Sequence, residues 1–189
     1  MLDSNFNAKL GDFGLARLMD HELGSQTTGL AGTFGYMAPE YISTGRASKE
    51  SDVYSFGVVT LEIVTGRKSV DPRQGRETSL VEKVWELYGK GEVITAVDEK
   101  LRIDGFDEKQ AECLVAVGLW CAHPDRNSRP SIKQAIQVLN LEAPLPHLPT
   151  KMPVATYHVW SSSSGMSSGG ATCNVFKCST WSLSRYLLL

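Results

Sequence analysis

The residues whose types and spacing could support chemistry lie together near the start of the sequence, between positions 12 and 40. Asp12 opens an Asp-Phe-Gly triplet that ends at Gly14, and Ala38-Pro39-Glu40 forms a second motif further along. Hydroxyl side chains that could accept a phosphate lie between the two motifs, at Ser25, Thr27, Thr28 and Thr33. A lone carboxylate at the end of a strand is an ordinary turn residue, so the meaning of Asp12 depends on its surroundings.

Two short strands and a long loop must position these side chains. Residues 1–2 and 8–10 are predicted to form a hairpin, because the segment between them is rich in turn-forming residues. Residues 20–35 contain many Gly, Ser and Thr residues without hydrophobic periodicity, which predicts a long loop. Loops of this length inside compact domains are usually functional. We therefore expect the hydroxyl groups to lie on an accessible loop.

Hydrophobic periodicity predicts four helices after the second motif. They span Lys49–Thr65, Ser79–Tyr88, about residues 107–121, and residues 131–139. The first carries apolar residues on every face, which predicts a helix buried all round and ended by Gly66. The second begins with a capping box of Ser79 and Glu82 and is predicted to end before Gly89.

The composition changes after Glu142. The stretch APLPHLPTKMP contains four prolines, which prevent a helix, and SSSSGMSSGG is of low complexity. We therefore predict three parts: a domain over residues 1–142, a Pro/Ser/Gly-rich linker or tail over 143–172, and an unassigned tail over 173–189.

Composition limits the classes of function. The chain has 189 residues, of which 42% are hydrophobic, and a formal net charge of −2, so it can form one globular domain but lacks the basic surface typical of nucleic-acid binding. No apolar run approaches the ~20 residues of a membrane span, and no signal peptide is evident. Four cysteines do not form a dense disulfide framework, and Cys113 and Cys121 are predicted to be buried free thiols. As written, the chain is expected to be soluble and cytoplasmic.

Four sequence motifs, taken in their order along the chain, resemble those of a known protein family. The stretch Met37-Ala38-Pro39-Glu40, which holds the second motif, begins 23 residues after Gly14. DVYSFG follows at Asp52 in the apolar helix, and Arg129-Pro130 precedes the last helix. Residues 1–142 resemble the second half of a eukaryotic protein kinase domain, which implies a mainly α fold, the large C-terminal lobe, with a remnant β-hairpin. The pattern GTFGYMAPEY is of the serine/threonine type. The segment GLWCAHPDRNSRPSIKQAIQVL is similar to plant receptor-like kinases of the L-type (legume) lectin kind.

The resemblance assigns roles to the first motif and the loop after it. Asp12 would ligate a Mg²⁺ ion that bridges the β- and γ-phosphates of ATP, with Phe13 and Gly14 completing its motif. The activation segment would then run from this motif through the loop hydroxyl groups to Ala38, Pro39 and Glu40. Within it, the Thr33 hydroxyl would contact a catalytic aspartate.

The resemblance also assigns structural roles to three charged residues. Glu40 and Arg129 would form an ion pair that ties the activation segment to the last helices. Asp52 would accept backbone hydrogen bonds from the catalytic loop. On composition alone Asp52 is an acid in the first turn of a helix, where the helix dipole favours it. Both interpretations of Asp52 are compatible.

Several kinase motifs do not occur in the sequence as written. It contains no G-x-G-x-x-G-x-V loop, no V-A-I-K lysine and no H-R-D-x-x-x-x-N loop. We expect the parent kinase to use ATP and Mg²⁺ to phosphorylate Ser or Thr of protein substrates, and these residues alone to be inactive. The parent would be membrane-anchored, with this part on the cytoplasmic side of the plasma membrane. An alternative is a non-catalytic kinase-like module that binds a partner kinase or its substrates.

Overall fold

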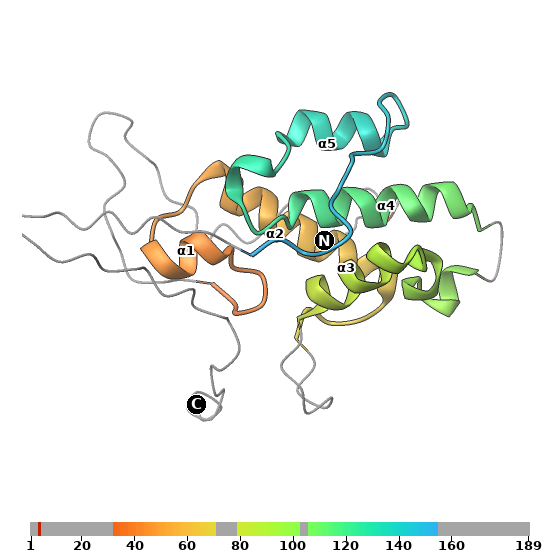
Figure 1. The fold of residues 1–189 in the computed structure, drawn as a ribbon, viewed down its shortest axis with the longest axis horizontal. Coiled ribbons are helices and arrows are strands. Elements are labelled where there is room, and N and C mark those ends of the chain that lie inside the picture. Colours follow the sequence, from red (N-terminus) through yellow and green to blue (C-terminus); the bar gives the residue numbers. More distant parts are fainter. Residues whose placement is uncertain (1–3, 5–31, 71–78, 103–105, 155–189) are drawn as a thin grey trace, which may run out of the picture.

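The computed structural model describes Ser4 and residues 32–70, 79–102 and 106–154 (Figure 1). The predicted hairpin, the Asp12–Gly14 motif, Ser25, Thr27 and Thr28 lie outside these residues. Within them the fold is helical, without a β-strand. The mainly α prediction is thus confirmed for this part of the chain.

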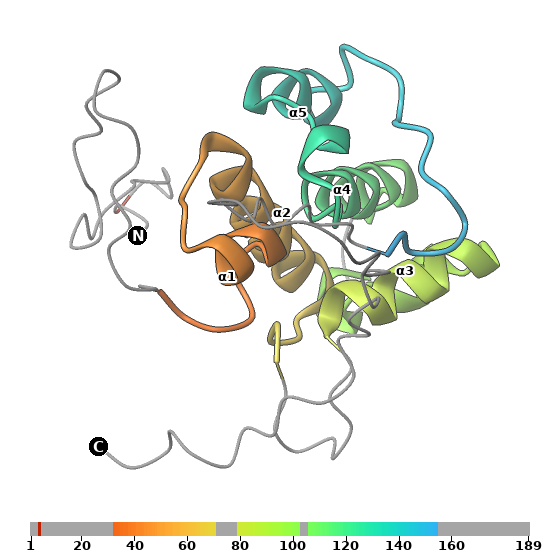
Figure 2. The same ribbon diagram turned by 60° about the vertical axis from the view of Figure 1, so that its left-hand side comes forward.

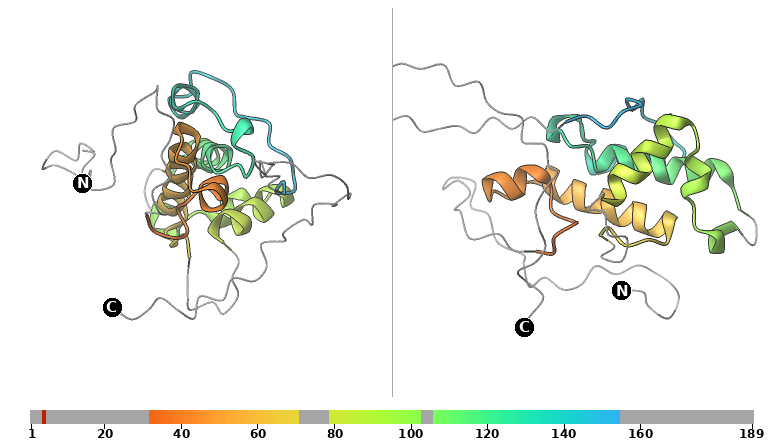
Figure 3. Two further views of the ribbon diagram at one scale, coloured as in Figure 1. Left: turned by 90° about the vertical axis from the view of Figure 1, so that its left-hand side faces the viewer. Right: turned by 60° about the horizontal axis from the view of Figure 1, so that its bottom comes forward.

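The described residues form α-helices joined by loops and short 3-10 helices. The α-helices are α1 (Pro39–Thr44), α2 (Lys49–Thr65), α3 (Leu80–Lys90), α4 (Glu108–Cys121) and α5 (Ile132–Leu139). The 3-10 helices are η2 (Val93–Ala96), η3 (Glu99–Arg102) and η4 (Arg126–Ser128). Figures 2 and 3 show α1 beside α2, with α3 and α5 on different sides of α4.

The centre of the fold is the pair of long helices α2 and α4, which cross at two glycines. A Cβ atom on Gly57 would lie 2.6 Å from the Ala122 nitrogen and 2.7 Å from the Gly118 carbonyl oxygen. A Cβ atom on Gly118 would lie 2.7 Å from Leu61 Cδ2. All three distances are shorter than real Cβ contacts, so the helices reach this separation only because both positions lack a side chain.

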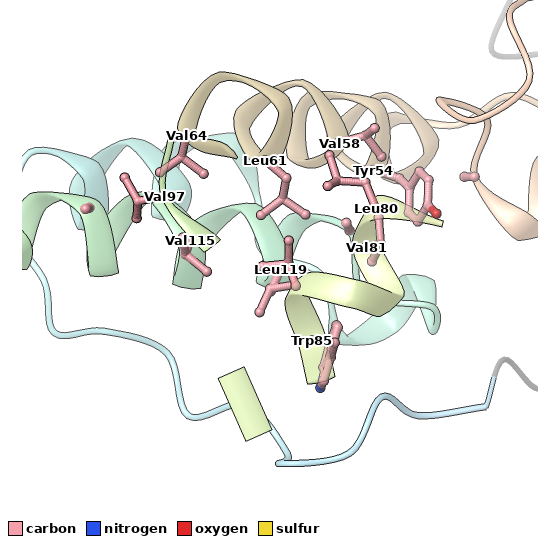
Figure 4. Packing of buried hydrophobic residues seen from close by; sticks show 14 residues of the cluster. Tyr54, Val58, Leu61, Val64, Leu80, Val81, Trp85, Val97, Val115 and Leu119 are labelled. Carbon is pink, nitrogen blue, oxygen red and sulfur yellow. The ribbon is translucent and has the colours of Figure 1, made fainter. Parts of the chain in front are cut away.

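A hydrophobic cluster fills the space between α2, α4 and α3 (Figure 4). Val58 and Leu61 of α2 and Leu119 of α4 are fully buried there, and Trp85 of α3 is 1% exposed. A second, smaller cluster lies between α4 and α5 and includes the free thiols of Cys113 and Cys121. The prediction that these two cysteines are buried free thiols is confirmed.

Helix α2 differs from its prediction on one face. Its bounds agree with the sequence analysis, but Phe56 is 36%, Val59 41% and Ile63 62% exposed. The prediction that α2 is buried all round is therefore wrong for this structure. The reason is that α3 and α4 cover only one side of the helix, so its apolar residues on the other side face solvent.

Two further features were not predicted. Helix α3 continues through Gly89 and Lys90 and ends at Gly91, which adopts the left-handed conformation with φ of 75°. Helix α1, only six residues long, was not expected because the Ala38-Pro39-Glu40 motif shows no periodicity. Proline is favourable in a first helical turn, where no backbone donor is required of it.

Residues 143–154 follow the surface of the lobe. They pass from the end of α5 towards α3, where Leu148 and Met152 pack against the first hydrophobic cluster (Figure 2). The domain boundary at residue 142 stays a prediction. None of the helices in the described residues combines the length and apolar character needed to cross a lipid bilayer.

Candidate functional site

Hydrogen bonds of Tyr36 hold the segment 32–38 against α2. The Tyr36 hydroxyl donates to the two carboxylate oxygens of Glu62, at 2.9 and 3.0 Å. Ser55 Oγ donates to the Tyr36 carbonyl oxygen at 2.7 Å, and the Ser69 backbone N–H donates to Glu62. Burial and the hydrogen bond to Glu62 raise the pKa of Tyr36, so its hydroxyl stays protonated and remains a donor. The segment is thus fixed at both its side chain and its backbone.

This anchoring leaves Thr33 and Phe34 on the surface. The Tyr36 N–H donates to the Thr33 carbonyl oxygen at 3.2 Å and closes a turn, while Thr33 is exposed and Phe34 is 62% exposed. A hydroxyl and an aromatic ring are therefore displayed by a turn whose base is fixed on α2. The role of Thr33 towards a catalytic aspartate stays a prediction.

Arg129 is the centre of a second, buried network. Its two terminal nitrogens donate to the two carboxylate oxygens of Glu40, at 2.6 and 2.7 Å. Its Nε donates to the His123 carbonyl oxygen at 2.7 Å, and one terminal nitrogen also donates to the Glu50 carbonyl oxygen at 2.8 Å. The guanidinium carbon lies 5.0 Å from the centre of the Tyr54 ring. The ion pair implied by the resemblance is therefore present.

The geometry of this ion pair explains how it joins distant parts of the chain. Glu40 is in α1 and Arg129 lies just before α5, 89 residues later. The Arg129 side chain is 0% exposed and that of Glu40 is 8% exposed, so water screens the pair little. Two parallel N–H···O bonds also fix its orientation, which only a guanidinium can do. The pair therefore holds α1, and the segment before it, on the helical lobe.

The roles predicted for Asp52 and for a bound metal ion are not tested by these contacts. Asp52 lies in the first turn of α2 and is exposed, and partial desolvation raises the pKa of its carboxyl group. The residues that the structure describes contain no group of three His, Cys, Asp or Glu side chains placed to hold a metal ion. Asp12, to which the resemblance assigns the Mg²⁺ ion, lies outside those residues, and its role stays a prediction.

Sequence reasoning missed the role of Glu62. It is a half-buried carboxylate in a helix that is otherwise apolar on most faces, and it anchors both Tyr36 and Ser69. An acid in such a helix needs hydrogen-bond partners when it is desolvated. The position of Glu62 in an apolar run therefore indicates that it has hydrogen-bond partners, but the sequence does not indicate which residues these are.

Comparison with known proteins identifies the family. The family model described as the protein kinase domain matches residues 1–139 of the sequence. L-type lectin-domain containing receptor kinase IX.1 of Arabidopsis thaliana is 88% identical over 176 residues, which are 91% of this chain and 27% of that protein. Receptor kinase IX.2 of the same plant is 68% identical, over 88% of this chain and 26% of that protein. The chain thus spans about a quarter of the length of these relatives.

A solved structure shares the fold. The pseudokinase domain of BIR2, described as an immune regulator of the RLK/Pelle family, superposes with a TM-score of 0.59 at 39% identity, over 75% of this chain and 40% of that one. The family model covers well over half of the chain, and the helices and the Glu40–Arg129 pair agree with it. The chain therefore belongs to the protein kinase family, and its described helices are part of the large lobe of a plant receptor-like kinase domain.

Proposed function

We propose that this chain provides the activation segment and the helical lobe of a protein kinase that transfers the γ-phosphate of ATP to Ser or Thr of protein substrates. The observation that carries the proposal is the double anchoring of residues 32–44. The Glu40–Arg129 pair and the Tyr36–Glu62 bonds hold this segment on α2 while Thr33 remains exposed. Such positioning suits a segment that must present a substrate hydroxyl at a fixed place.

The proposed roles of the other residues follow from the kinase motifs. Asp12 would bind Mg²⁺, which neutralises the charge that develops on the transferred phosphoryl group. Asp52, exposed at the start of α2, would accept backbone hydrogen bonds from the catalytic loop. The loop hydroxyl groups of Ser25, Thr27 and Thr28 would be sites of regulatory phosphorylation.

We further propose that these 189 residues have no kinase activity on their own. The sequence lacks the motifs that supply the phosphate-binding lysine and the catalytic aspartate. Phosphoryl transfer depends on positioning and electrostatic stabilisation by all of these groups together. The parent protein would be a membrane-anchored receptor kinase, as the names of its relatives suggest, with this part in the cytoplasm.

A second candidate is a non-catalytic module that binds a partner kinase or its substrates. The likeness to a pseudokinase domain, at 39% identity, supports this alternative. A pseudokinase keeps the fold as a binding surface without the chemistry. The two candidates differ in whether the activation segment of this chain can support catalysis when the missing motifs are supplied.

A chimera separates the candidates. Residues 1–142 replace the matching segment of the relative that is 88% identical, receptor kinase IX.1, and incorporation of labelled phosphate is measured with Mg²⁺ and ATP. We expect the chimera to match the unaltered relative and to lose activity in Asp12→Ala. A folded but inactive chimera would favour the non-catalytic module.

The unmodified chain is assayed in parallel. We expect no incorporation of phosphate. Incorporation that disappears in Asp12→Ala would overturn the proposal that the chain is inactive alone, whereas incorporation that survives this change indicates a contaminating kinase.

A further inference from the structure

The proline-rich segment after α5 remains on the lobe. We call residues 143–154 the strap; they pass from α5 to α3 in an extended form (Figure 2). Four prolines occur in the strap, and each removes a backbone donor and favours an extended residue before it. Three of these residues carry large apolar side chains, in the dipeptides Leu145-Pro146, Leu148-Pro149 and Met152-Pro153. The strap therefore cannot pair as an ordinary strand, and its carbonyl oxygens accept hydrogen bonds from water or from side-chain donors.

One such donor is the indole of Trp85. Trp85 Nε1 donates to the Pro149 carbonyl oxygen at 2.9 Å, across 64 residues of sequence. Figure 4 shows the indole lying between α3 and the strap. Leu148 and Met152, on either side of Pro149, pack against the hydrophobic cluster that contains Trp85. A buried indole needs a hydrogen-bond partner, and aromatic-lined grooves hold proline-rich peptides with the same combination of contacts.

Gly89 lies where the strap crosses α3. A Cβ atom on Gly89 would lie 2.0 Å from the Thr150 carbonyl oxygen, so no side chain fits there while the strap is in place. A glycine inside a helix makes that helix less stable than an alanine at the same position would. Helix α3 therefore keeps an unfavourable residue at the one turn where the strap passes. Gly91, by contrast, has no atom within 4 Å of its added Cβ.

The contact resembles a peptide in a groove more than a packed core. Beside it remains a pocket of about 360 Å³, bordered by Glu82 and Glu86 of α3 and by Lys151 and Met152 of the strap. The pocket is open to solvent, so it is a surface hollow along the strap and not a cavity of the core. Lys90 of α3 also borders the pocket and forms an ion pair with Glu86 at 2.6 Å, so charged side chains of both signs lie around it.

From these contacts we propose that α3 carries a binding groove for proline-rich extended peptides, and that the chain fills the groove with its own residues 146–153. The recognised pattern is apolar-Pro-x-x-apolar-Pro, supplied here by Leu148 to Pro153. The strap is then a tethered ligand of the lobe that a second proline-rich segment can replace. This proposal does not depend on the kinase activity proposed above.

The first test uses two glycine variants of the full chain. Trypsin cleavage after Lys151, in the strap, is measured relative to cleavage after Lys133, in α5. In Gly89→Ala we expect the ratio to rise about fivefold or more, because the new methyl group displaces Thr150. The control is Gly91→Asn, because asparagine tolerates the left-handed conformation of this position and a side chain there touches nothing in the strap; the ratio should stay within about twofold of the unaltered chain. An unchanged ratio in Gly89→Ala would overturn the proposal.

The second test asks whether the vacated groove binds a peptide. In the full chain, Leu148→Asp with Met152→Asp removes the apolar anchors of the strap but leaves α3 intact. A synthetic peptide of residues 143–154 is added, and the indole N–H resonance of Trp85 is followed by NMR. We expect saturable binding to the variant and about tenfold weaker binding to the unaltered chain, whose tethered strap competes at a millimolar effective concentration.

The controls decide the outcome. A peptide with the same two Asp substitutions should leave the Trp85 resonance unchanged. No shift with the natural peptide, or equal binding to variant and unaltered chain, would overturn the groove. If the double variant does not fold, the peptide titration is repeated on Met152→Asp alone, which removes one of the two apolar anchors of the strap, and the same outcomes apply.

Discussion

Replacing Arg129 by alanine should lower the free energy of unfolding by about 3–5 kcal/mol, since it leaves a buried carboxylate without its partner. Glu40 is buried and accepts two short hydrogen bonds from Arg129, at 2.6 and 2.7 Å. The change would also remove the donor of the His123 and Glu50 carbonyl oxygens. Each buried polar group left without a partner costs about 1–3 kcal/mol by itself, so the expected loss is a conservative figure.

The loss of unfolding free energy expected for Arg129→Ala is large relative to the total stability of a domain. Native domains are stable by about 5–15 kcal/mol, and the exposed apolar face of α2 (Phe56, Val59 and Ile63) places this lobe towards the lower end. Arg129→Ala should therefore unfold much of the protein at room temperature or sharply reduce its soluble yield. The free energy of unfolding of Arg129→Lys should lie between those of the unaltered chain and Arg129→Ala, because an ammonium group keeps the charge but cannot form the two parallel bonds to Glu40.

Urea unfolding followed by far-UV circular dichroism measures the effect. Arg67→Ala is the matched control, since Arg67 is exposed beside the end of α2 and should change stability by no more than about 0.5 kcal/mol. The double variant Glu40→Ala with Arg129→Ala should lose less than the sum of the single variants, because no charge is left unpaired. Equal effects of Arg129→Ala and Arg67→Ala would refute the reasoning. High salt should alter the difference little, as the pair is buried.

Three further predictions concern modification and pH. An intact related kinase should phosphorylate residues 25–33, mainly at Thr27 and Thr28, as measured by mass spectrometry; phosphate found only elsewhere would exclude this loop as the target. Burial lowers the pKa of His123 below its ordinary value of 6.5, so the unfolded chain binds the proton first and the free energy of unfolding should fall as the pH drops below 6.5. Urea titrations over a pH series should show a shallower fall in His123→Asn, and an identical slope would contradict the assignment. Burial raises the pKa of Cys121 to about 12, so an alkylating reagent at neutral pH should label it at least about tenfold more slowly in the folded than in the urea-unfolded chain. Equal rates, read by mass spectrometry, would show that this thiol is accessible.

Local signals in the sequence predicted where α3 and α5 begin and where α2 ends. The start of α3 follows the capping box of Ser79 with Glu82, and the start of α5 follows that of Ser131 with Gln134, both present in the structure. The end of α2 follows Gly66 in its left-handed conformation. These interactions join residues three or four positions apart, so the sequence alone is sufficient to predict them.

The contacts of the candidate site depended on more than local signals. No periodicity links Glu40 to Arg129, and only the family resemblance pointed to their ion pair. The bonds of Tyr36 and Ser69 to Glu62 had no predicted counterpart at all, because partners 26 and 7 residues away are chosen by how the segments pack.

Tertiary packing alone decided which apolar residues are buried. The sequence of α2 is apolar on every face, yet Val58 and Leu61 are buried against α4 while Ile63 is 62% exposed. In the same way, the sequence predicts a helix end at Gly89, whereas in the structure Gly89 lies inside α3 beneath the strap. A sequence specifies which side chains favour burial, but the removal of a given face from water requires another segment to lie on it, and that depends on the arrangement of the whole chain.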